Sequence, residues 1–592
     1  MLVQQPDQGF EAIFVIDRNE RGGNRKRHQN CKVICGNQAS KIATIEQITA
    51  IRREEQVVPR WKGVSLRLNL AYSQPFRYMS AFKKLASDTA LYGVSTILGR
   101  LLNYALVPVQ TYAFGQPKQL ASNVELYAYI ALLLVLYTLG LETAFFRFAA
   151  RRPETTPKVF SDTLSMVIVI TSMATVVLLW LAPDIAIWLD YPDQTTFIRW
   201  SALIVAIDAI TAIPFARLRV ENKARQFVKA KMINIGIVVA LNVFFIIFCK
   251  DVYEGDYLPQ LRPFVDYIYN PQIGPGYIFL ANLLGNACYF LLLRKAFKGF
   301  RFQLDWPEIR TLYLYAYPIM LTGLANVVNN LTDRLFLRHY LPEGFYPNLT
   351  NEDALGIYGQ CYKLSVFMAL AIQSFRFAAD PFFFSKAEDK NAPGLLARVT
   401  KWFIIVCVLI WIGVSLNLDV LGLLIGPKYR QGLGIVPLLL LGNLFLGIYF
   451  NLAFWFKLSD KTKYGTLITV IGAVVTLLGN MFLIPLMGYM GCAVAFLASS
   501  VVMTVICYVL GEKHYPVPYD VRSALGYITG AGLLIYASLQ INIPNPWIAV
   551  PFHLALFGLS VAVIAVIERD TIREGWARFR RSRKPAPVGS SQ

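Results

Sequence analysis

Between Tyr313 and Pro381 the sequence contains the run Thr322-Gly-Leu-Ala-Asn-Val-Val-Asn-Asn-Leu-Thr-Asp-Arg334, which is polar at regular intervals inside an apolar segment. The polar side chains follow one another at steps of three or four residues: Thr322, Asn326, Asn329, Asn330 and Asp333. This spacing predicts a helix that carries its polar side chains on one face.

A lysine lies in the apolar segment that follows. Lys363 is about 13 Å into that segment at the 1.5 Å rise of a helix, on the face that also holds Gly356, Gly359 and Ser374. A lysine at the centre of a bilayer costs about 2.5–3.5 kcal/mol, and such groups usually face a bundle interior or a water-filled cavity. We therefore interpret the two segments as membrane helices that line a polar cavity and are joined by a short outer loop.

The whole chain has the composition of a membrane protein. It has 592 residues, of which 55% are hydrophobic, and its mean hydropathy is +0.46. Apolar blocks of about 20 residues recur along it, and in lipid such blocks must be helices, because the backbone has to satisfy its own hydrogen bonds. We predict an all-α polytopic fold with about fourteen membrane spans, near 89–110, 124–146, 160–181, 197–216, 230–249, 275–293, 312–335, 354–378, 401–424, 433–456, 465–486, 490–510, 523–541 and 548–567.

The net charge of +20 is concentrated in alternate connections. In a soluble chain this excess would suggest a nucleic-acid partner. Here the Lys and Arg residues follow every second span, in the segments 147–158, 217–231, 294–310, 376–401, 457–463 and 569–584. By the positive-inside rule both termini are cytoplasmic. We expect no nucleic-acid partner.

Residues 1–78 differ from the rest, because they are polar and contain no apolar run long enough for a span. They are either a cytoplasmic tail or an extension before a natural start at Met79, and we favour the second interpretation. His28, Cys31 and Cys35 could be three metal ligands, but a fourth is missing from the local spacing, so we expect no metal. The eight cysteines show no disulfide framework.

Short similarities six spans apart suggest an internal repeat. Leu241-Asn-Val-Phe-Phe-Ile246 is similar to Gly479-Asn-Met-Phe-Leu-Ile484, and each precedes a glycine-containing turn and another span. Repeated halves with a site between them are common in transporters, although apolar helices also resemble one another by chance. The expected domains are 1–78, a first lobe 79–296, a cytoplasmic linker 297–311, a second lobe 312–511, two further spans 512–567 and a basic tail 568–592.

From about Met79 to Ile567 the chain resembles the polysaccharide flippases, often called Wzx, of the multidrug/oligosaccharidyl-lipid/polysaccharide exporter superfamily. The resemblance rests on Tyr317-Pro318, the Asn-rich run that ends at Asp333-Arg334, Gly356-Ile-Tyr-Gly-Gln-Cys-Tyr-Lys-Leu364, Ala378-Ala-Asp-Pro381 and Asn480-Met-Phe-Leu-Ile-Pro-Leu-Met-Gly488.

The resemblance implies a MATE-like fold, with two six-helix lobes around a central cavity and two additional C-terminal helices. It implies translocation of undecaprenyl-pyrophosphate-linked oligosaccharide across a bacterial inner membrane by alternating access, for the biosynthesis of O-antigen, capsule or exopolysaccharide. A monomer without cofactor or enzymatic activity is expected. Its expected partners are the lipid-linked substrate, membrane lipids and the polymerase and glycosyltransferases of the same biosynthesis.

A pyrophosphate head group needs a wet, cationic path, and Arg and Lys pair with phosphate oxygens by charge-assisted hydrogen bonds. Arg100 and Lys363, one in each expected lobe, are therefore candidate substrate ligands. The alternative for Arg100 is an ion pair with Asp208 inside its own lobe. Both interpretations remain open at this stage.

The polar face of the Asn-rich helix supplies the other candidates. Asn326, Asn329, Asn330 and Asp333 could line a sugar path, and the alternative is that these residues bond helices together, at about 0.6–2 kcal/mol each. Asp333-Arg334 could also be a local ion pair.

Two acidic residues inside spans are candidates for coupling to protons or sodium, namely Asp208 and Glu142. Glu142 lies near Arg147, so a local ion pair is the simpler explanation for it.

Three other functions remain open. A lipid II flippase and a cation-coupled multidrug exporter would have the same fold. A membrane glycan polymerase or glycosyltransferase would need an active site in an outer segment, and the connection 250–274 carries Asp251, Glu254, Asp256 and Asp266. The chain has no Walker A motif, so ATP hydrolysis is not expected.

Overall fold

The computed structural model describes residues 13–15, 30–34, 43–44, 93, 97–102, 104–151, 153–385, 391–459, 461–541, 543, 545–571 and 573. The chain divides into two compact units, Met1–Met79 and Ser80–Gln592. They are described separately below.

The described residues of the first unit form a small antiparallel sheet in the order β1-β2-β3. Its strands are β1 (Ile13–Val15), β2 (Asn30–Ile34) and β3 (Ala43–Thr44). Ile13 pairs with Ile34, and Cys31 in β2 pairs with Ala43. These strands were not expected from the amino-acid sequence. Two of the three metal-ligand candidates considered above, His28 and Cys35, lie outside the described residues.

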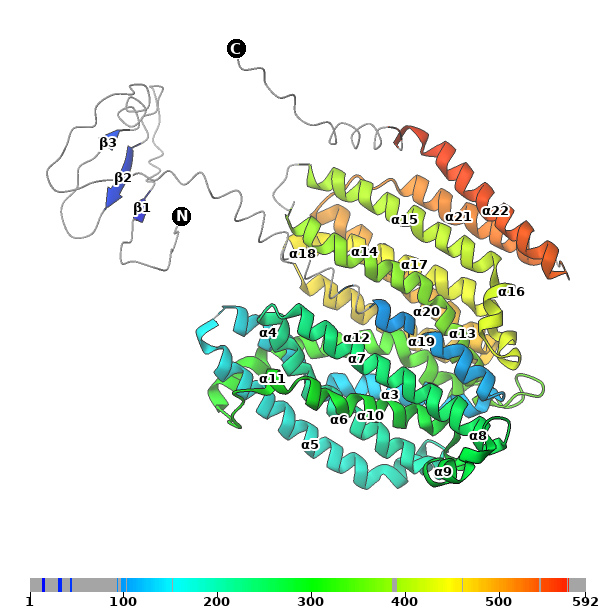
Figure 1. Ribbon diagram of the computed structural model, residues 1–592. Helices are drawn as coiled ribbons and strands as arrows, with labels where there is room; N and C mark the ends of the chain where they lie inside the picture. The colour runs from blue at the N-terminus through cyan, green and yellow to red at the C-terminus, as the bar shows by residue number, and fades with distance from the viewer. Residues whose placement is uncertain are drawn as a thin grey trace, which may run out of the picture. The chain divides into compact units, whose positions relative to one another are not determined.

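The second unit is a helical bundle, which confirms the predicted fold class (Figure 1). Residues 97–102 and 104–113 are helical and are called the first helix below. The elements that follow in the first half of the bundle are η1 (Pro117–Leu120), α3 (Ala121–Thr138), α4 (Leu141–Arg151), η2 (Pro153–Thr155), α5 (Thr156–Trp188), η3 (Pro192–Gln194), α6 (Thr195–Val220), α7 (Ala224–Val243), η4 (Phe244–Cys249), α8 (Lys250–Glu254), η5 (Pro259–Leu261), α9 (Arg262–Ile268), η6 (Pro271–Gly276), α10 (Tyr277–Leu292) and α11 (Arg294–Phe297).

The second half begins after a linker. Its elements are α12 (Trp306–Tyr340), α13 (Asn351–Tyr362), η7 (Lys363–Ser365), α14 (Val366–Ser385), α15 (Ala392–Leu416), α16 (Leu418–Leu421), η8 (Gly422–Leu424), η9 (Pro427–Ile435), α17 (Val436–Leu452), α18 (Phe454–Leu458), α19 (Lys463–Met487) and α20 (Tyr489–His514). Two more helices follow, α21 (Val521–Gln540) and α22 (Pro546–Ile567), and both pack on α15 (Figure 1).

Twelve helical segments within the described residues are long and apolar enough to cross a membrane. The other two predicted spans have different outcomes. The span 89–110 lies partly outside the described residues. The span 523–541 coincides with α21, which is helical but is not among the twelve. The total of fourteen therefore remains a prediction.

The second predicted span, 124–146, is corrected by the structure, because its helix breaks inside that range. α3 ends at Thr138, and Leu139 and Gly140 both have positive φ angles before α4 starts. A Cβ atom on Gly140 would lie 2.8 Å from the carbonyl oxygen of Ala316, so glycine permits both the turn and the close approach of α12. The candidate span is instead Pro117–Thr138.

The long helix α12 connects the packing of the two halves. It packs against α3, α4 and α5 in the first half and against α13, α19 and α20 in the second. The expected repeat has a parallel in the packing, since α7 packs on α10 and α19 packs on α20. The matching asparagines, Asn242 and Asn480, are both fully buried.

The linker before α12 is bound to α5. The backbone N–H groups of Arg301, Gln303 and Asp305 donate to side chains of α5. The Lys158 ammonium lies 2.5 Å from a carboxylate oxygen of Asp305, and this hydrogen bond holds the pKa of Asp305 below its usual value. The linker therefore fixes the first turn of α12 against the first half.

Candidate functional site

A cavity of about 350 Å³ lies between the two halves of the bundle. The first helix, α3, α7 and α10 line it from one side, and α12, α13 and η7 line it from the other. Its polar lining residues are Tyr104, Gln110, Asn123, Tyr127, Asn242, Asn282, Arg334, Gln360, Tyr362 and Lys363. Two of them are cationic, and among the described residues that line the cavity none is acidic.

Arg334 lies in α12 and reaches the cavity beside Tyr362. Its guanidinium carbon lies 4.5 Å from the centroid of the Tyr362 ring, which is a cation–π contact. Its Nε is buried and has no hydrogen-bond partner. Among the described residues, no carboxylate lies within ion-pair distance of Arg334. The cavity therefore contains a guanidinium whose hydrogen-bonding capacity is not fully used.

Lys363 enters the cavity from a break between two helices. α13 starts with a capping box, in which Thr350 and Asp353 hydrogen-bond to each other's backbone N–H groups, and ends one residue before the short turn η7. From this turn the Lys363 ammonium donates to Oε1 of Gln110, at 3.3 Å, in the first half. An amide oxygen does not neutralise the ammonium, so Lys363 has no counter-charge among the described lining residues, whereas Arg334 interacts electrostatically with Asp333 behind the lining.

Three further residues of the lining have buried oxygen atoms without a partner. These atoms are Oδ1 of Asn123, Oδ1 of Asn242 and Oε1 of Gln360. Buried polar atoms are normally hydrogen-bonded, to protein, water or ligand. The arrangement fits a cavity that holds water and a polar ligand, with cationic donors and neutral amides around it.

Asn329 and Asp333, which were expected to line the path, are not among the lining residues of this cavity. Asn329 is 3% exposed, and its Oδ1 accepts hydrogen bonds from Thr476 and Ser499. Asp333 is 4% exposed and accepts a hydrogen bond from the Tyr358 hydroxyl. Both side chains point into the second half, because α12 packs on α19 and α20 along that face. Their hydrogen bonds join α12 to neighbouring helices of the second half.

Asn326 and Asn330 occupy a different part of the α12 surface. Nδ2 of Asn330 donates to the backbone oxygen of Asn326 at 2.7 Å and to its Oδ1 at 3.2 Å. Asn326 is exposed and Asn330 is half-buried, but neither belongs to the cavity lining. Their role in a sugar path remains a prediction. Arg334, one helical turn after Asn330, does line the cavity. It was not among the substrate-binding candidates that the polar spacing of this helix suggested.

Arg100 lies near the cavity without lining it. Its side chain is exposed, and both Arg100 and Arg334 interact electrostatically with Tyr104, which belongs to the lining. Among the described residues Arg100 has no ion-pair partner, and the alternative of a pair with Asp208 is not observed. Its role as a substrate ligand remains a prediction.

Asp208 belongs to a polar cluster inside the first half. Nδ2 of Asn286 donates to its Oδ1 at 2.9 Å, and Asn234 in turn donates to Oδ1 of Asn286 at 3.1 Å. Lys231 is the cation that interacts with it electrostatically. Asn282, one helical turn before Asn286 on α10, lines the cavity. The cluster is therefore one helical turn from the cavity along α10.

Glu142 has a simpler environment. It forms an ion pair with Arg219 at the end of α6, and both side chains are more than a third exposed. The local partner is therefore Arg219 and not Arg147, whose guanidinium lies 4.2 Å from the Tyr315 ring centroid.

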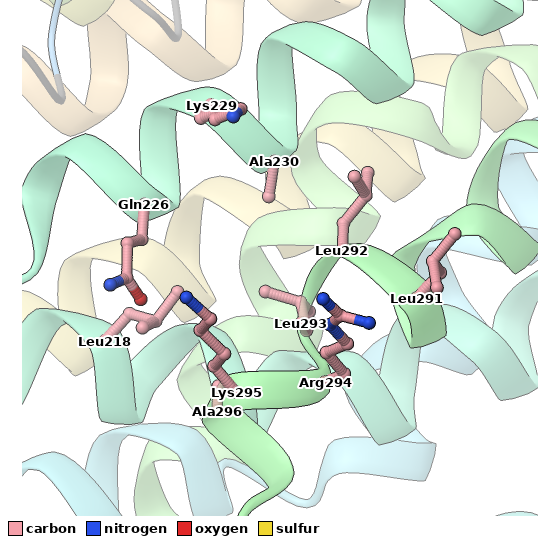
Figure 2. Close-up of a pocket in the computed structure, with 10 residues that line it drawn as sticks. All are labelled: Leu218, Gln226, Lys229, Ala230, Leu291, Leu292, Leu293, Arg294, Lys295 and Ala296. Carbon is pink, nitrogen blue, oxygen red and sulfur yellow. The ribbon is translucent and has the colours of Figure 1, made fainter.

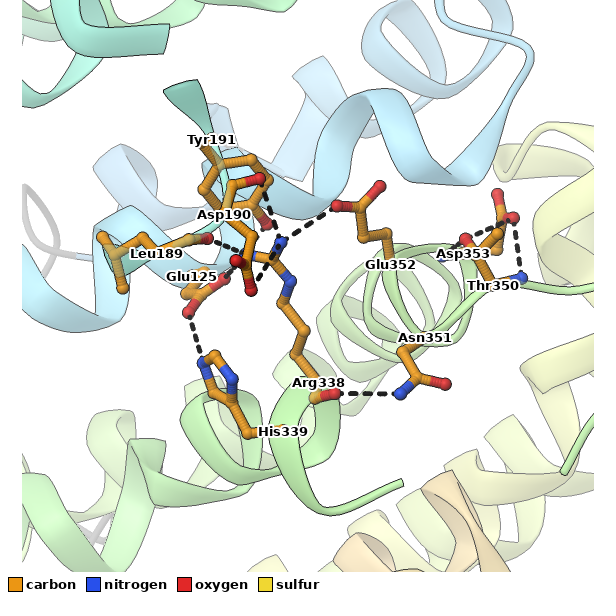
Figure 3. A network of polar contacts seen from close by, with 10 residues as sticks. All are labelled: Glu125, Leu189, Asp190, Tyr191, Arg338, His339, Thr350, Asn351, Glu352 and Asp353. Atoms are coloured by element: carbon orange, nitrogen blue, oxygen red, sulfur yellow. Dashed lines mark hydrogen bonds and ion pairs between the residues drawn. The ribbon is translucent and has the colours of Figure 1, made fainter. Parts of the chain in front are cut away.

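At one end of the bundle, buried ionic contacts join the halves (Figure 3). Arg338 of α12 is 7% exposed, and its Nη1 donates to Oε2 of Glu125, which is fully buried in α3, at 3.2 Å. The same guanidinium donates to Glu352 at 3.0 Å, to the backbone oxygen of Leu189 and to that of Asp190 at 3.3 Å. We call this region the Arg338 end.

Two aromatic rings complete the Glu125 site. The Tyr191 hydroxyl donates to Oε2 of Glu125 at 3.0 Å, and its ring lies 3.9 Å from the Arg338 guanidinium carbon. Nε2 of His339 lies 3.4 Å from the other carboxylate oxygen (Figure 3). Because both charges are removed from water, their pairing is essential to this end of the bundle.

Backbone contacts close the same end. The N–H of Lys118 donates to Asp353 at 2.9 Å, next to Glu352. The Tyr429 hydroxyl donates to the carbonyl oxygen of Phe114 at 2.7 Å, and the N–H of Gly426 donates to the Thr111 hydroxyl at 3.0 Å. These contacts join η1 and the segment before it to α13 and η9, so two elements of the second half hold the first half here.

Gly356 permits the closest of these approaches, which gives a testable prediction. A Cβ on Gly356 would lie 2.1 Å from the backbone oxygen of Pro117, and backbone cannot move aside as a side chain can. Gly356→Ala should therefore separate α13 from η1 and lower thermal stability by about 1–3 kcal/mol, a typical cost of overpacking. The melting temperature of the purified protein measures this.

The control is Gly394→Ala. Gly394 lies in α15, and a Cβ there would have no atom within 4 Å. Alanine favours a helix over glycine, so this variant should be as stable as the wild type or slightly more so. Equal melting temperatures for Gly356→Ala and Gly394→Ala would contradict the close contact.

Sequence reasoning missed Glu125, Arg338 and Arg334. Arg338 and Glu125 are 213 positions apart, so no local spacing could have paired them. A signal existed for Glu125, since it is a carboxylate within an apolar block, and such residues in membranes are usually paired or functional. Asp333-Arg334 was considered as a local ion pair; the two side chains do interact electrostatically, but among the described residues they are not within ion-pair distance.

The fold is that of known membrane transporters. The structure is similar to that of the lipid II flippase MurJ in an inward closed conformation, with a TM-score of 0.61 and 14% identity over 82% of this chain and 100% of that chain. It is also similar to an inward-facing multidrug resistance MATE family transporter of the MOP superfamily, with a TM-score of 0.52 and 11% identity over 70% of this chain and 94% of that one.

A third similar structure is a MATE protein in complex with MaD3S, with a TM-score of 0.51 and 12% identity over 72% of this chain and 95% of that chain. At these identities the likeness shows the fold alone. No family model matches the chain, and no curated protein does. The second unit of this membrane protein is thus all-α and has the fold shared by these MATE and lipid-flippase structures.

Proposed function

We propose that this protein is a flippase for lipid-linked oligosaccharide, with an undecaprenyl-pyrophosphate carrier as the lipid. The observation that supports it most is the pair of cations, Arg334 and Lys363, in a polar cavity between the two halves. The lining itself contains no acid, and Asp333, which interacts electrostatically with Arg334, offsets only one of the two positive charges, so an anion between the cations would relieve the remaining repulsion. A pyrophosphate supplies that anion and accepts the unused donors of the guanidinium.

Alternating access accounts for the closed Arg338 end. By the positive-inside rule this end is extracytoplasmic and both termini are cytoplasmic. The membrane that the family resemblance implies is a bacterial inner membrane. The ionic and backbone contacts at the Arg338 end would then block release outward, and the head group would enter from the cytoplasmic side. The apolar tail of the substrate can stay in the lipid throughout. No covalent step is needed.

The expected partners follow from this role. A monomer suffices, because the cavity is formed by the two halves of one chain. The polymerase and glycosyltransferases of a surface polysaccharide would supply and consume the substrate. Lipid II carries the same pyrophosphate-linked carrier, so the cavity chemistry also suits a lipid II flippase, which differs in the glycan. A pocket for cationic drugs would favour acidic lining residues, which makes that alternative weaker.

A flipping assay tests the proposal. The purified protein is reconstituted in vesicles with fluorescent undecaprenyl-pyrophosphate oligosaccharide, and the loss of outer-leaflet probe is followed with a membrane-impermeant quencher. We expect translocation of this probe but not of a cationic dye. Transport of the dye alone would support the drug exporter instead. Elongated glycan in the vesicles would support the polymerase. If neither the lipid-linked probe nor the dye moves, both transport functions are rejected.

We propose that Asp208 couples transport to a cation gradient, and Asp208→Asn tests this. The asparagine can still accept a hydrogen bond from Asn286, so the cluster should be retained while its charge is lost. We expect the stimulation of flipping by a proton or sodium gradient to disappear, with the basal rate within about twofold of the wild type. Initial rates with and without each gradient measure the effect.

Glu142→Gln is the comparison variant, because Glu142 is the other candidate for coupling. If its pair with Arg219 is structural, gradient stimulation should persist in this variant. If gradient stimulation persists in Asp208→Asn and is lost in Glu142→Gln, Glu142 and not Asp208 is the coupling residue.

A further inference from the structure

A second cavity, of about 490 Å³, lies away from the central one, at the ends of α6, α7 and α10 (Figure 2). Leu218 contributes from the end of α6, Gln226 and Lys229 from the first turns of α7, and Leu291 to Ala296 from the end of α10 and from α11. We call it the α11 pocket. All three long helices belong to candidate membrane spans that start or end here, so the pocket lies at a membrane boundary.

Three cations surround the pocket. Lys229, Arg294 and Lys295 are exposed, and among the described residues none of them has an ion-pair partner. Figure 2 shows Arg294 and Lys295 pointing from α11 toward α7, from which Gln226 points back toward them. Like charges gathered around one hollow repel each other, and a bound anion would relieve this repulsion.

The acid in the adjoining turn is already engaged. Glu221 lies 2.7 Å from Nε of Arg217 and 2.6 Å from the Lys223 ammonium. Arg217 also donates to the backbone oxygens of Ala296 and Lys298. Arg217 therefore holds α11 in place, while the three cations of the lining face the pocket.

The walls of the pocket distinguish a lipid from a free ion. Leu218, Leu292 and Leu293 line it together with the cations. The lining residue Leu291 is 68% exposed, in the last turn of a membrane helix. Acyl chains can lie along these side chains while a phosphate reaches the cations, as in basic pockets between helices on the cytoplasmic side of other membrane proteins. A free phosphate ion would gain nothing from this apolar edge.

We propose that the α11 pocket binds the phosphate head group of an anionic glycerophospholipid. The site is separate from the central cavity, but the two share helices, because α7 and α10 also supply Asn242 and Asn282 to the central cavity. A lipid held here would join the ends of α6, α7 and α10. Its binding does not depend on the identity of the transported substrate.

The test uses the full chain in phosphatidylcholine nanodiscs with increasing phosphatidylglycerol, and native mass spectrometry counts the lipids retained. The variant Lys229→Gln/Arg294→Gln/Lys295→Gln should bind phosphatidylglycerol about 100-fold more weakly than the wild type, as expected for three cations near a lipid head group. The charge-preserving variant Lys229→Arg/Arg294→Lys/Lys295→Arg should keep most of the affinity, which shows that the fold is retained.

A matched control removes the same charges elsewhere. Arg398, Lys461 and Lys463 are exposed cations on other elements, and Arg398→Gln/Lys461→Gln/Lys463→Gln should bind as the wild type does. Equal losses in both triple variants would overturn the proposal in favour of general surface attraction. Full competition by inorganic phosphate would overturn the lipid as the ligand and leave an anion site.

Discussion

Arg334→Gln and Lys363→Gln should each reduce the initial rate of flipping by at least about 30-fold. Each variant keeps a polar, though shorter, side chain and removes one of the two positive charges that line the central cavity. Losing one partner of a buried, charge-assisted contact costs about 2 kcal/mol or more, which corresponds to that factor. The quenching assay in reconstituted vesicles measures the rate.

The geometry predicts a difference between the two sites. Arg334→Lys keeps the charge but loses the planar fork that can bind two phosphate oxygens, so it should recover only part of the rate. Lys363→Arg keeps the charge and should recover more, provided that the longer side chain still fits beside Gln110.

The controls are Arg301→Gln and Lys461→Gln, which remove exposed cations outside the cavity. Both should flip at the rate of the wild type. Rates within twofold of the wild type for both cavity variants would refute the proposed head-group site. Equal loss in the control variants would show that overall charge, and not the cavity, sets the rate.

Arg338→Met should lower thermal stability more than any surface substitution in this chain. The variant leaves Glu125 fully buried without its guanidinium, and breaking a buried ion pair in this way costs about 3–5 kcal/mol. The Leu189 and Asp190 carbonyl groups also lose a donor. The temperature at which half of the detergent-solubilised protein aggregates measures the effect.

A double variant isolates the pair. In Glu125→Gln/Arg338→Met neither charge remains. Adding Glu125→Gln should therefore restore a large part of the stability that Arg338→Met alone loses. Arg262→Met serves as the control, because Arg262 and Asp266 are 4.0 Å apart and about half exposed, and such surface pairs contribute little.

The same variants test the role of the Arg338 end as a barrier. If the contacts there hold the two halves together on the outer side, Glu125→Gln/Arg338→Met should fold but should open more readily, so that water-soluble reagents reach the central cavity from that side. If the double variant is as unstable as Arg338→Met, the loss of stability does not come from leaving the Glu125 charge buried without a partner. Unchanged access from the outer side in a stable double variant would contradict the barrier.

Much of the fold could be predicted from the sequence. Apolar blocks of span length must be helical in lipid, since only a helix satisfies its own backbone hydrogen bonds there, and this reasoning places α5, α6, α19 and α20 correctly. It failed at Leu139 and Gly140, where the turn depends on the close approach of α12 and not on apolar length. The strands β1 to β3 were not predicted, because they lie in the polar segment 1–78, which has no apolar block of span length.

The sequence by itself determined that Lys363 is a cation within a membrane segment, because such a charge is costly wherever the helix lies. Only the tertiary structure decided which polar side chains of α12 face which neighbour. Helical periodicity groups residues on a face, but packing chooses the face that meets the cavity, so Asn329 and Asp333 turned into the second half while Arg334 reached the cavity. Glu125 and Arg338 likewise meet only because the fold brings α3 and α12 together, and burial then makes each charge depend on the other.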